Sequence, residues 1–331
     1  MLILNKAAVA KCLSHAECVA LLRDTMIAVS KRDVIMPLRQ YMQIPQTQGK
    51  FTMMPGYMGQ SGDNPRCFGV KLVSKYPPVN GSSSHIGAVM LYDADSGQPV
   101  AMLDAGELTA IRTSAASGLA TDALARADAC VLTLMGCGDE AFHHVQAILA
   151  VRQLSKIVVW GRSPERAAEF LERCDSAGIL PVGIEVAVEA DAETAVGQAD
   201  IVCTVTSATQ PILKGAWLQP GSHVNLVGAA VKTSREADDE VVTRGRFYID
   251  YRDSAMDQAG ELLDAIAAGL ITEQHIVGEL GDLLQGNCAG RSSDQEITVY
   301  KSLGVAAQDL AAASRALRNA KRDNIGVEVA W

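Results

Sequence analysis

Short apolar runs alternate with amphipathic segments through the middle of the chain. Runs such as Ile157-Val158-Val159-Trp160 and Ile201-Val202-Cys203 are almost continuously apolar, which is typical of strands buried on both faces of a parallel sheet. Six strands are predicted, over residues 130–135, 156–160, 183–188, 200–204, 223–227 and 246–249. Helical segments lie between them, over residues 140–152, 164–177 and 191–198. This alternation predicts a Rossmann-type domain with a doubly wound parallel sheet.

The first 115 or so residues have a different pattern. Residues 86–92 and 100–104 alternate in a way that predicts strands of a mixed or antiparallel sheet, and residues 106–125 predict a connecting helix. Residues 298–320 are rich in Ala and Leu with few helix breakers, so they predict one long helix that returns to the first domain. We therefore expect an α/β protein with two domains, a mixed α+β domain over 1–118 joined by 306–331, and the Rossmann domain over 119–305.

The composition is typical of a globular protein and argues against a nucleic-acid-binding, disulfide-rich or membrane protein. The 331 residues are 48% hydrophobic, so a packed core is expected, and the net charge of −9 comes without a basic run that could follow nucleic acid. The eight cysteines include no CxxC pair, which favours reduced core residues over disulfides or a metal site. With no apolar stretch of ~18 residues and no signal-like N-terminus, we expect a cytoplasmic protein without membrane contact.

A glycine-rich turn follows the first predicted Rossmann strand. Its residues, Gly136, Cys137, Gly138, Asp139, Glu140 and Ala141, form a GxGxxA loop that opens a helix, the context in which a dinucleotide pyrophosphate is bound. The glycines permit the tight turn and the approach of the phosphates, and the helix N-terminus favours the anion. An ordinary glycine-rich turn is the alternative. Cys137 is read as a small side chain that fits between two glycines.

The end of the second strand indicates the coenzyme. NAD-selective sites carry Asp or Glu there for the ribose 2′-hydroxyl, whereas this chain has Gly161, Arg162 and Ser163, with Arg166 following. Arg162 and Ser163 are suited to a 2′-phosphate, so we expect NADPH as coenzyme, with NADH possible. The alternative is that Arg162 is a solvated loop cation.

Three cations of the first domain, Arg39, Lys71 and Arg112, stand in largely apolar sequence. A buried cation needs a nearby anion, because desolvation would otherwise destabilise it strongly. That anion is either an internal Asp or Glu or the carboxylate of a substrate. The sequence alone leaves both possibilities open.

Several segments together give the chain a family resemblance. It resembles the ornithine cyclodeaminase and mu-crystallin family in Gly69-Val70-Lys71-Leu72-Val73, Ser84-His85, Thr109 to Ala116, Met54-Pro55-Gly56-Tyr57, the Gly136 loop, Asn225 to Ala229, and Gly278 to Gly304. The resemblance covers nearly the whole chain. It implies a homodimer whose first domain supplies the dimer interface and the substrate pocket, while the second binds a nicotinamide coenzyme.

The resemblance also implies residue roles. Arg39, Lys71 and Arg112, here called the carboxylate clamp, would hold the substrate carboxylate, with Met54 beside them. Lys71, His85 and Arg112 would be the catalytic residues, with Lys71 or His85 handling the imine proton. Thr113 would lie by the coenzyme phosphates, and the coenzyme would be lined by residues of the second domain, namely Thr206, Val227, Gly228, Ser302 and Gly304.

One departure from the family separates its branches. Cyclodeaminases carry an Asp shortly after the segment that is Asn225 to Ala229 here, and this chain has Ala230 in that place. A methyl group neither pairs an ammonium nor accepts a proton, so ornithine cyclodeamination loses its carboxylate unless Asp238 or Asp239 reaches the site. The Ser84-His85 pair is the one found in the ketimine reductase branch, although His85 can also be a structural strand residue.

We therefore expect an NADPH-dependent reductase of cyclic ketimine carboxylates that converts Δ1-pyrroline-2-carboxylate to L-proline, with Δ1-piperideine-2-carboxylate as an overlapping substrate. Hydride would be transferred to the C=N carbon. Alternatives are an amino-acid dehydrogenase of the alanine type, an ornithine cyclodeaminase, and a non-catalytic NADPH-binding protein like a lens crystallin.

Overall fold

The fold comprises two compact units. The computed structural model describes residues 1–76 and 85–330, with only the backbone described at residue 85. One unit is formed by Met1–Arg112 with Val305–Trp331, and the other by Thr113–Gly304. The boundary therefore falls inside helix α3 (Ala105–Leu124), which contributes residues to both units.

The first unit is built on a mixed sheet with the strand order β16-β1-β7-β6-β5-β4-β2, and β3 pairs with β4. Strand β1 is parallel to β7 and all other neighbours are antiparallel. The strands are β1 (Leu2–Leu4), β2 (Val34–Ile35), β3 (Gln40–Gln43), β4 (Lys50–Met58), β5 (Cys67–Lys75), β6 (His85–Asp93), β7 (Pro99–Asp104) and β16 (Val327–Glu328).

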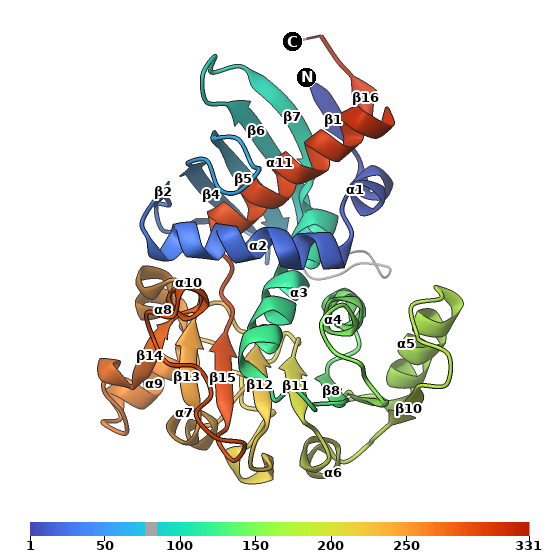
Figure 1. The fold of residues 1–331 in the computed structure, drawn as a ribbon, viewed down its shortest axis with the longest axis vertical. Helices are drawn as coiled ribbons and strands as arrows, with labels where there is room; N and C mark the ends of the chain where they lie inside the picture. Colours follow the sequence, from blue (N-terminus) through green and yellow to red (C-terminus); the bar gives the residue numbers. More distant parts are fainter. Residues whose placement is uncertain (77–84, 331) are drawn as a thin grey trace. The chain divides into compact units, whose positions relative to one another are not determined.

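Helices cover one face of this sheet. Helix α11 (Ala306–Asp323) packs on β4, β5 and β6 and on α2 (His15–Ser30), and α1 (Lys6–Cys12) packs beside it (Figure 1). A Cβ added to Gly69 of β5 would lie 2.9 Å from the side chain of Leu310, so α11 approaches the sheet closely where that strand has no side chain. Alternate residues of β5 are buried under this helix, as the two-residue period of a strand requires.

The second unit contains an all-parallel sheet in the order β10-β9-β8-β11-β12-β15-β13-β14. The strands are β8 (Val131–Met135), β9 (Lys156–Trp160), β10 (Glu185–Val188), β11 (Ile201–Thr204), β12 (His223–Leu226), β13 (Arg246–Ile249), β14 (Ile276–Glu279) and β15 (Thr298–Lys301). Strand order reverses between β8 and β11, where doubly wound sheets bind their ligands outside the carboxyl ends of the strands.

Helices connect these parallel strands. They are α4 (Asp139–Leu149), α5 (Pro164–Ser176), α6 (Ala192–Gly197), α7 (Asp239–Arg244), α8 (Arg252–Gln258), α9 (Gly260–Ala267) and α10 (Leu280–Gln285), with short 3-10 turns η1 (Gly215–Trp217) and η2 (Glu273–His275). Local sequence explains where α5 begins, because the Ser163 hydroxyl accepts from the backbone N–H of Arg166 and Pro164 occupies the first turn.

The predicted fold class, a Rossmann-type parallel sheet plus a mixed-sheet domain, is confirmed. The strands predicted at 156–160 and 246–249 coincide with β9 and β13. The helix predicted over 298–320 is wrong in its first part, because Thr298–Lys301 is the buried strand β15 between β12 and β13. Gly304, with φ +75°, lies between that strand and α11.

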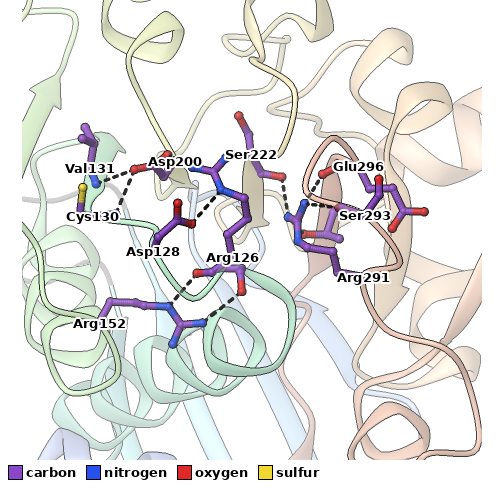
Figure 2. A network of polar contacts seen from close by, with 12 residues as sticks. Arg126, Asp128, Cys130, Val131, Arg152, Asp200, Ser222, Arg291, Ser293 and Glu296 are labelled. Atoms are coloured by element: carbon purple, nitrogen blue, oxygen red, sulfur yellow. Dashed lines mark hydrogen bonds and ion pairs between the residues drawn. The ribbon is translucent and has the colours of Figure 1, made fainter.

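An ion pair between Arg126 and Asp200 lies at the amino-terminal edge of the parallel sheet. Figure 2 shows Arg126 between Asp128 and Asp200, and its Nη2 donates to Asp200 Oδ1 at 2.6 Å. Asp200 Oδ2 in turn accepts from the backbone N–H groups of Cys130 and Val131, at 2.9 and 3.0 Å. Because Asp200 precedes β11 and Val131 begins β8, this carboxylate fixes two central strands at the edge remote from their carboxyl ends.

None of the helices in the described part of the chain is long and apolar enough to cross a membrane. All eight cysteines are unpaired, and five of them are buried.

Candidate functional site

The carboxyl ends of the central parallel strands bring the predicted coenzyme residues to one edge of the sheet. In Figure 1 the arrowheads of β11, β12, β13 and β15 point to this edge. Most of these residues follow a strand within three residues: Gly136, Cys137 and Gly138 after β8, Gly161, Arg162 and Ser163 after β9, Thr206 after β11, Val227 and Gly228 after β12, and Ser302 and Gly304 after β15. Asp139, Glu140 and Ala141 form the first turn of α4, Arg166 lies in the first turn of α5, and Thr113 lies in α3. Sequence spacing alone could not show that these loops share an edge.

The Gly136 loop has the shape needed to approach a phosphate group. Gly136 has φ +129°, and a Cβ there would lie 2.9 Å from the carbonyl oxygen of Val205, so a side chain is excluded on both grounds. A Cβ on Gly138, by contrast, would meet no atom within 4 Å. Gly138 is the N-cap of α4, and no side chain of the described residues caps the first N–H groups of this helix, which leaves them available to an anion. The loop therefore fits a dinucleotide pyrophosphate at the point where strand order reverses.

Two arginines follow β9. The side chains of Arg162 and Arg166 are exposed, and no described residue forms an ion pair with either guanidinium. The next carboxylate along the chain, Glu165, accepts a hydrogen bond from the Ser163 hydroxyl at 2.6 Å, which lowers the pKa of Glu165. Two exposed cations thus follow this strand closely, Arg162 in the loop and Arg166 in the first turn of α5, while Ser163 is already engaged by Glu165 and by the start of α5.

In the first unit, one buried carboxylate holds two of the predicted clamp cations. Asp309, on α11, lies 2.8 Å (Oδ2) from Lys71 Nζ, and its Oδ1 accepts from Arg112 Nε at 2.9 Å. The side chains of Lys71, Arg112 and Asp309 are all at most 5% exposed. The internal anion that the sequence left open is therefore Asp309, and this single carboxylate faces two cations.

The pKa values in this cluster follow from burial and from the neighbouring charges. Burial, helped by the positive charges of Arg112 and Arg39 and opposed by Asp309, lowers the pKa of Lys71 to about 7. Burial alone would raise the pKa of Asp309, but the charges of Arg112 and Lys71 lower it instead. Asp309 therefore remains ionised while Lys71 titrates near neutral pH.

The guanidinium of Arg112 is fixed on one side only. Its Nε donates to Asp309 and its Nη1 donates to Gln308 Oε1 at 3.0 Å. Within residues 1–76 and 85–330, no acceptor contacts Nη2. Because Asp309 and Gln308 are consecutive on α11, one helix sets the plane of the guanidinium and leaves Nη2 for another acceptor.

The other predicted residues of the first domain are placed as follows. Met54 is buried in β4 and lies opposite Lys71 in the strand register. Arg39 precedes β3, is half-buried, and contributes its charge to lowering the pKa of Lys71. His85 begins β6 opposite Lys75, but its side chain and the whole of Ser84 lie outside the described residues. Thr113 follows Arg112 on α3 and is buried.

The carboxylates that could replace the missing cyclodeaminase Asp are engaged elsewhere. Ala230 is partly buried against the core of the second unit. Asp238 caps α7 by accepting from the backbone N–H of Val241 at 3.0 Å, and it also accepts from that of Gly215 at 2.9 Å. Asp239 forms an ion pair with Arg235. Asp238 thus already serves as a helix cap and Asp239 already has a cationic partner.

Sequence reasoning missed the acidic residues that hold the candidate sites. Asp309 lies 238 residues from Lys71 in the chain, and its only local signal is one acidic side chain on the apolar face of an Ala-rich helix. Glu236 and Asp250 are not part of the predicted coenzyme loops, but each accepts hydrogen bonds from residues at the strand ends that carry those loops. Asp250 Oδ2 accepts from the backbone N–H groups of Leu303 and Gly304, both at 2.7 Å. No motif in the sequence marks either residue.

Known proteins match the chain over almost its full length. A model of the ornithine cyclodeaminase/mu-crystallin family matches residues 1–324. The Δ(1)-pyrroline-2-carboxylate reductase of Paracoccus denitrificans is 34% identical over 299 residues, covering 88% of this chain and 93% of the relative.

Solved structures agree with this match. The Thermococcus litoralis Δ(1)-pyrroline-2-carboxylate reductase, solved with NADH and L-proline, has a TM-score of 0.93 and 31% identity, covering 99% of this chain and 100% of that one. An archaeal alanine dehydrogenase dimer with bound NAD has a TM-score of 0.90 and 27% identity, covering 100% and 99%. With the family model, these matches show that the chain belongs to the ornithine cyclodeaminase/mu-crystallin family of NAD(P)-dependent oxidoreductases.

Proposed function

We propose that the protein is an NADPH-dependent reductase of cyclic ketimine carboxylates, converting Δ1-pyrroline-2-carboxylate to L-proline and Δ1-piperideine-2-carboxylate to L-pipecolate. The observation that carries the proposal is the buried cluster of Lys71, Asp309 and Arg112. Two cations share one carboxylate there, so one positive charge is uncompensated when Lys71 is protonated. A buried excess charge of this kind favours a ligand that brings one negative charge.

The substrate carboxylate would be bound at Arg112 Nη2, which has no acceptor among the described residues. Arg112 offers its Nη2 N–H groups, in a plane that Asp309 and Gln308 already fix, and Arg39 adds a second cation nearby. An ammonium has three N–H donors, and Asp309 engages Lys71 from one side, so a donor of Lys71 remains for substrate. Fixing these groups before binding reduces the ordering required when the ring is aligned.

A ketimine must gain a proton at nitrogen as the carbon is reduced. Lys71, with a pKa of about 7, changes protonation state in the range where a general acid works at neutral pH. We assign the imine proton to Lys71 or to His85, which together with Arg112 form the catalytic set. The nicotinamide, when bound, supplies the hydride that reduces the C=N carbon.

The coenzyme is assigned to the carboxyl edge of the second unit, with NADPH preferred and NADH possible. The Gly136 loop would hold the pyrophosphate and Arg162, with Arg166, the 2′-phosphate. Support for NADPH comes from the two exposed arginines. The first carboxylate after β9, Glu165, already accepts a hydrogen bond from Ser163. Thr113, Thr206, Val227, Gly228, Ser302 and Gly304 would line the remaining length of the coenzyme.

We assign residues 1–118 with 306–331 to substrate binding and dimerisation, and residues 119–305 to coenzyme binding. On the sheet face opposite α11, Val70 of β5 pairs with Pro55 of β4 and with Met90 of β6, and all three are half-exposed. On the same face Ile86 is 63% exposed, and the rings of Phe68 and Tyr92 stack 5.0 Å apart. An apolar sheet face of this extent favours burial against a second copy.

The archaeal alanine dehydrogenase is described as a dimer, which supports the proposal that a second copy of this chain covers the apolar sheet face. Light scattering should therefore give twice the chain mass for the wild type and the single chain mass for Val70→Lys. A monomeric wild type would contradict dimerisation through this face, as would a Val70→Lys protein that remains a dimer.

The proposed reaction is tested by initial rates with purified protein. NADPH oxidation is followed with Δ1-pyrroline-2-carboxylate, with pyruvate plus ammonia, and without a second substrate, and ammonia release is measured from L-ornithine. We expect turnover with the cyclic imine and no ammonia from ornithine. Turnover with pyruvate and ammonia alone would make the protein an amino-acid dehydrogenase. Ammonia release from ornithine alone would make it a cyclodeaminase, and NADPH binding without any turnover would make it a binding protein.

A further inference from the structure

One buried carboxylate lies between two loops at the carboxyl edge of the parallel sheet. Glu236 Oε1 accepts from the backbone N–H of Thr206 at 2.7 Å and from its hydroxyl at 2.6 Å. Its Oε2 accepts from the backbone N–H groups of Gly228 and Ala229, at 2.6 and 3.3 Å, and from the Thr204 hydroxyl at 2.8 Å. The loops after β11 and β12 are therefore joined through one fully buried side chain.

A second buried pair extends this connection to the next strand. The backbone N–H of Glu236 donates to Glu261 Oε1 at 3.0 Å, and Glu261 Oε2 lies 3.1 Å from Lys301 Nζ. Lys301 is the last residue of β15 and also donates to the carbonyl oxygen of Ala229. Glu261 and Lys301 have 0% exposed side chains, so the three strand ends are held by groups that water does not reach.

The two loops also approach each other closely beside Glu236. A Cβ on Gly228 would lie 2.1 Å from the carbonyl oxygen of Thr206 and 2.6 Å from Glu236 Oε1. The absence of a side chain at Gly228 therefore lets the two loops touch. Burial raises the pKa of Glu236, while its hydrogen bonds to Thr206 and the charge of Lys301 oppose that rise.

We infer that Glu236 is a positioning residue for coenzyme binding, because it fixes the Thr206 and Gly228 loops in one arrangement before the coenzyme arrives. Glu236 lies beneath the two loops and acts through them. The inference rests on the proposed assignment of Thr206 and Gly228 to the coenzyme, and it adds a residue that no local motif reveals.

The isosteric substitution Glu236→Gln tests this role sharply. Thr206 and Gly228 donate backbone N–H groups to different oxygens of the carboxylate. A glutamine has one carbonyl oxygen, which accepts, and one NH2 group, which only donates. In either orientation of the amide, the NH2 group therefore faces the backbone N–H of one of the two loops and leaves that N–H without an acceptor. An unsatisfied buried N–H costs roughly 1–3 kcal/mol, so we expect amide exchange in one loop to be faster by about tenfold or more.

Two readouts separate positioning from general stability. Hydrogen exchange of the coenzyme-free protein reports on the loops themselves, and NADPH binding followed by coenzyme fluorescence reports on their use. For Glu236→Gln we expect the Kd for NADPH to rise about tenfold. Thr204→Val removes only a hydroxyl that donates to Glu236, and it should change the Kd in the same direction by a smaller factor. That second variant decides the question if Glu236→Gln does not fold.

Asp200→Asn is the matched control. Asp200 also accepts two backbone N–H groups of the same sheet, but at the amino-terminal edge (Figure 2). It should lower the Tm and leave the Kd for NADPH unchanged.

The results distinguish this inference from the proposed reaction. A Glu236→Gln protein with a lower Tm but wild-type loop exchange and Kd would overturn the positioning role. A rise in Kd of equal size in Asp200→Asn would overturn it as well. If the wild type binds NADPH but does not reduce the imine, the proposed substrate is wrong, and the exchange and Kd measurements still decide the role of Glu236.

Discussion

Lys71 Nζ and Asp309 Oδ2 lie 2.8 Å apart in a buried ion pair, although 238 residues separate them in the chain. Asp309 also holds Arg112 Nε at 2.9 Å, so one carboxylate of α11 organises cations that come from β5 and α3. This relationship makes the proton on Lys71 depend on Asp309, because the negative charge raises the pKa of a lysine that burial and Arg112 lower.

The pKa of Lys71 determines how activity depends on pH. Lys71 has a pKa of about 7 in the folded protein, below its usual 10.5, so its ammonium form is present below pH 7 and is lost above it. If that ammonium serves catalysis, kcat/KM falls as pH rises through about 7. Asp309→Asn keeps the shape of the side chain and removes the charge, so the falling limb should move to lower pH. A limb that stays in place in Asp309→Asn belongs to the substrate imine or to another residue.

The same titration has a consequence for stability. Between pH 7 and 10.5 the unfolded chain binds more protons at Lys71 than the folded one, so this residue makes stability rise with pH across that window. Urea denaturation at pH 6.5 and 9 measures the difference. We expect Lys71→Met to show a smaller rise between these pH values than the wild type, and an equal rise would exclude Lys71 as the source.

Arg112 is expected to affect substrate binding more than the chemical step. Arg112→Ala removes the Nη2 donors and should raise KM for the imine carboxylate about a hundredfold. Arg112→Lys restores charge without the fork, and it should recover only part of this loss. Steady-state kinetics at saturating NADPH measures both variants. An unchanged KM in Arg112→Ala would remove Arg112 from the clamp.

The two arginines after β9 give a prediction about coenzyme choice. Arg162→Asp replaces a cation with a group that binds a ribose 2′-hydroxyl, so the ratio of kcat/KM for NADPH to that for NADH should fall at least about tenfold. Lys156→Gln is the control, because it removes a positive charge at the opposite end of the same strand. Equal ratios in Arg162→Asp and the wild type would contradict binding of the 2′-phosphate by Arg162.

His85 can be separated from Lys71 by its own pH profile. His85→Ala should remove a titration near pH 6.5 from kcat if the imidazole relays the imine proton. A profile identical to that of the wild type excludes His85 as the titrating group, and the Asp309→Asn profile then tests Lys71.

Much of the second unit could be predicted from the sequence, because its buried strands are continuous apolar runs separated by amphipathic helices. Strand β15 (Thr298–Lys301) could not be separated from the helix predicted over 298–320. Its four residues are too few to show the two-residue period of a strand, and the Ala-rich segment that follows favours a helix. In the structure, Gly304 with φ +75° lies between the strand and helix α11. A single glycine in the sequence does not show that the backbone adopts this conformation.

The candidate sites could be predicted only in part. Lys71 and Arg112 stood out as cations in apolar sequence, but their partner Asp309 could not be identified, because nothing local relates residues so distant in the chain. Glu236 likewise accepts five hydrogen bonds, from donors at the end of β11 and in the loops after β11 and β12. Such convergence depends on the sheet order, which periodicity does not specify.

The most direct measurement compares two cyclic ketimines that differ only in the group the clamp would bind. We would measure kcat/KM with NADPH for Δ1-pyrroline-2-carboxylate and for 2-methyl-Δ1-pyrroline, in which a methyl group replaces the carboxylate. We predict a preference for the carboxylate of at least about a thousandfold in the wild type, and its near loss in Arg112→Ala. Comparable reduction of both imines, or no reduction of the carboxylate, would contradict a carboxylate-clamping ketimine reductase.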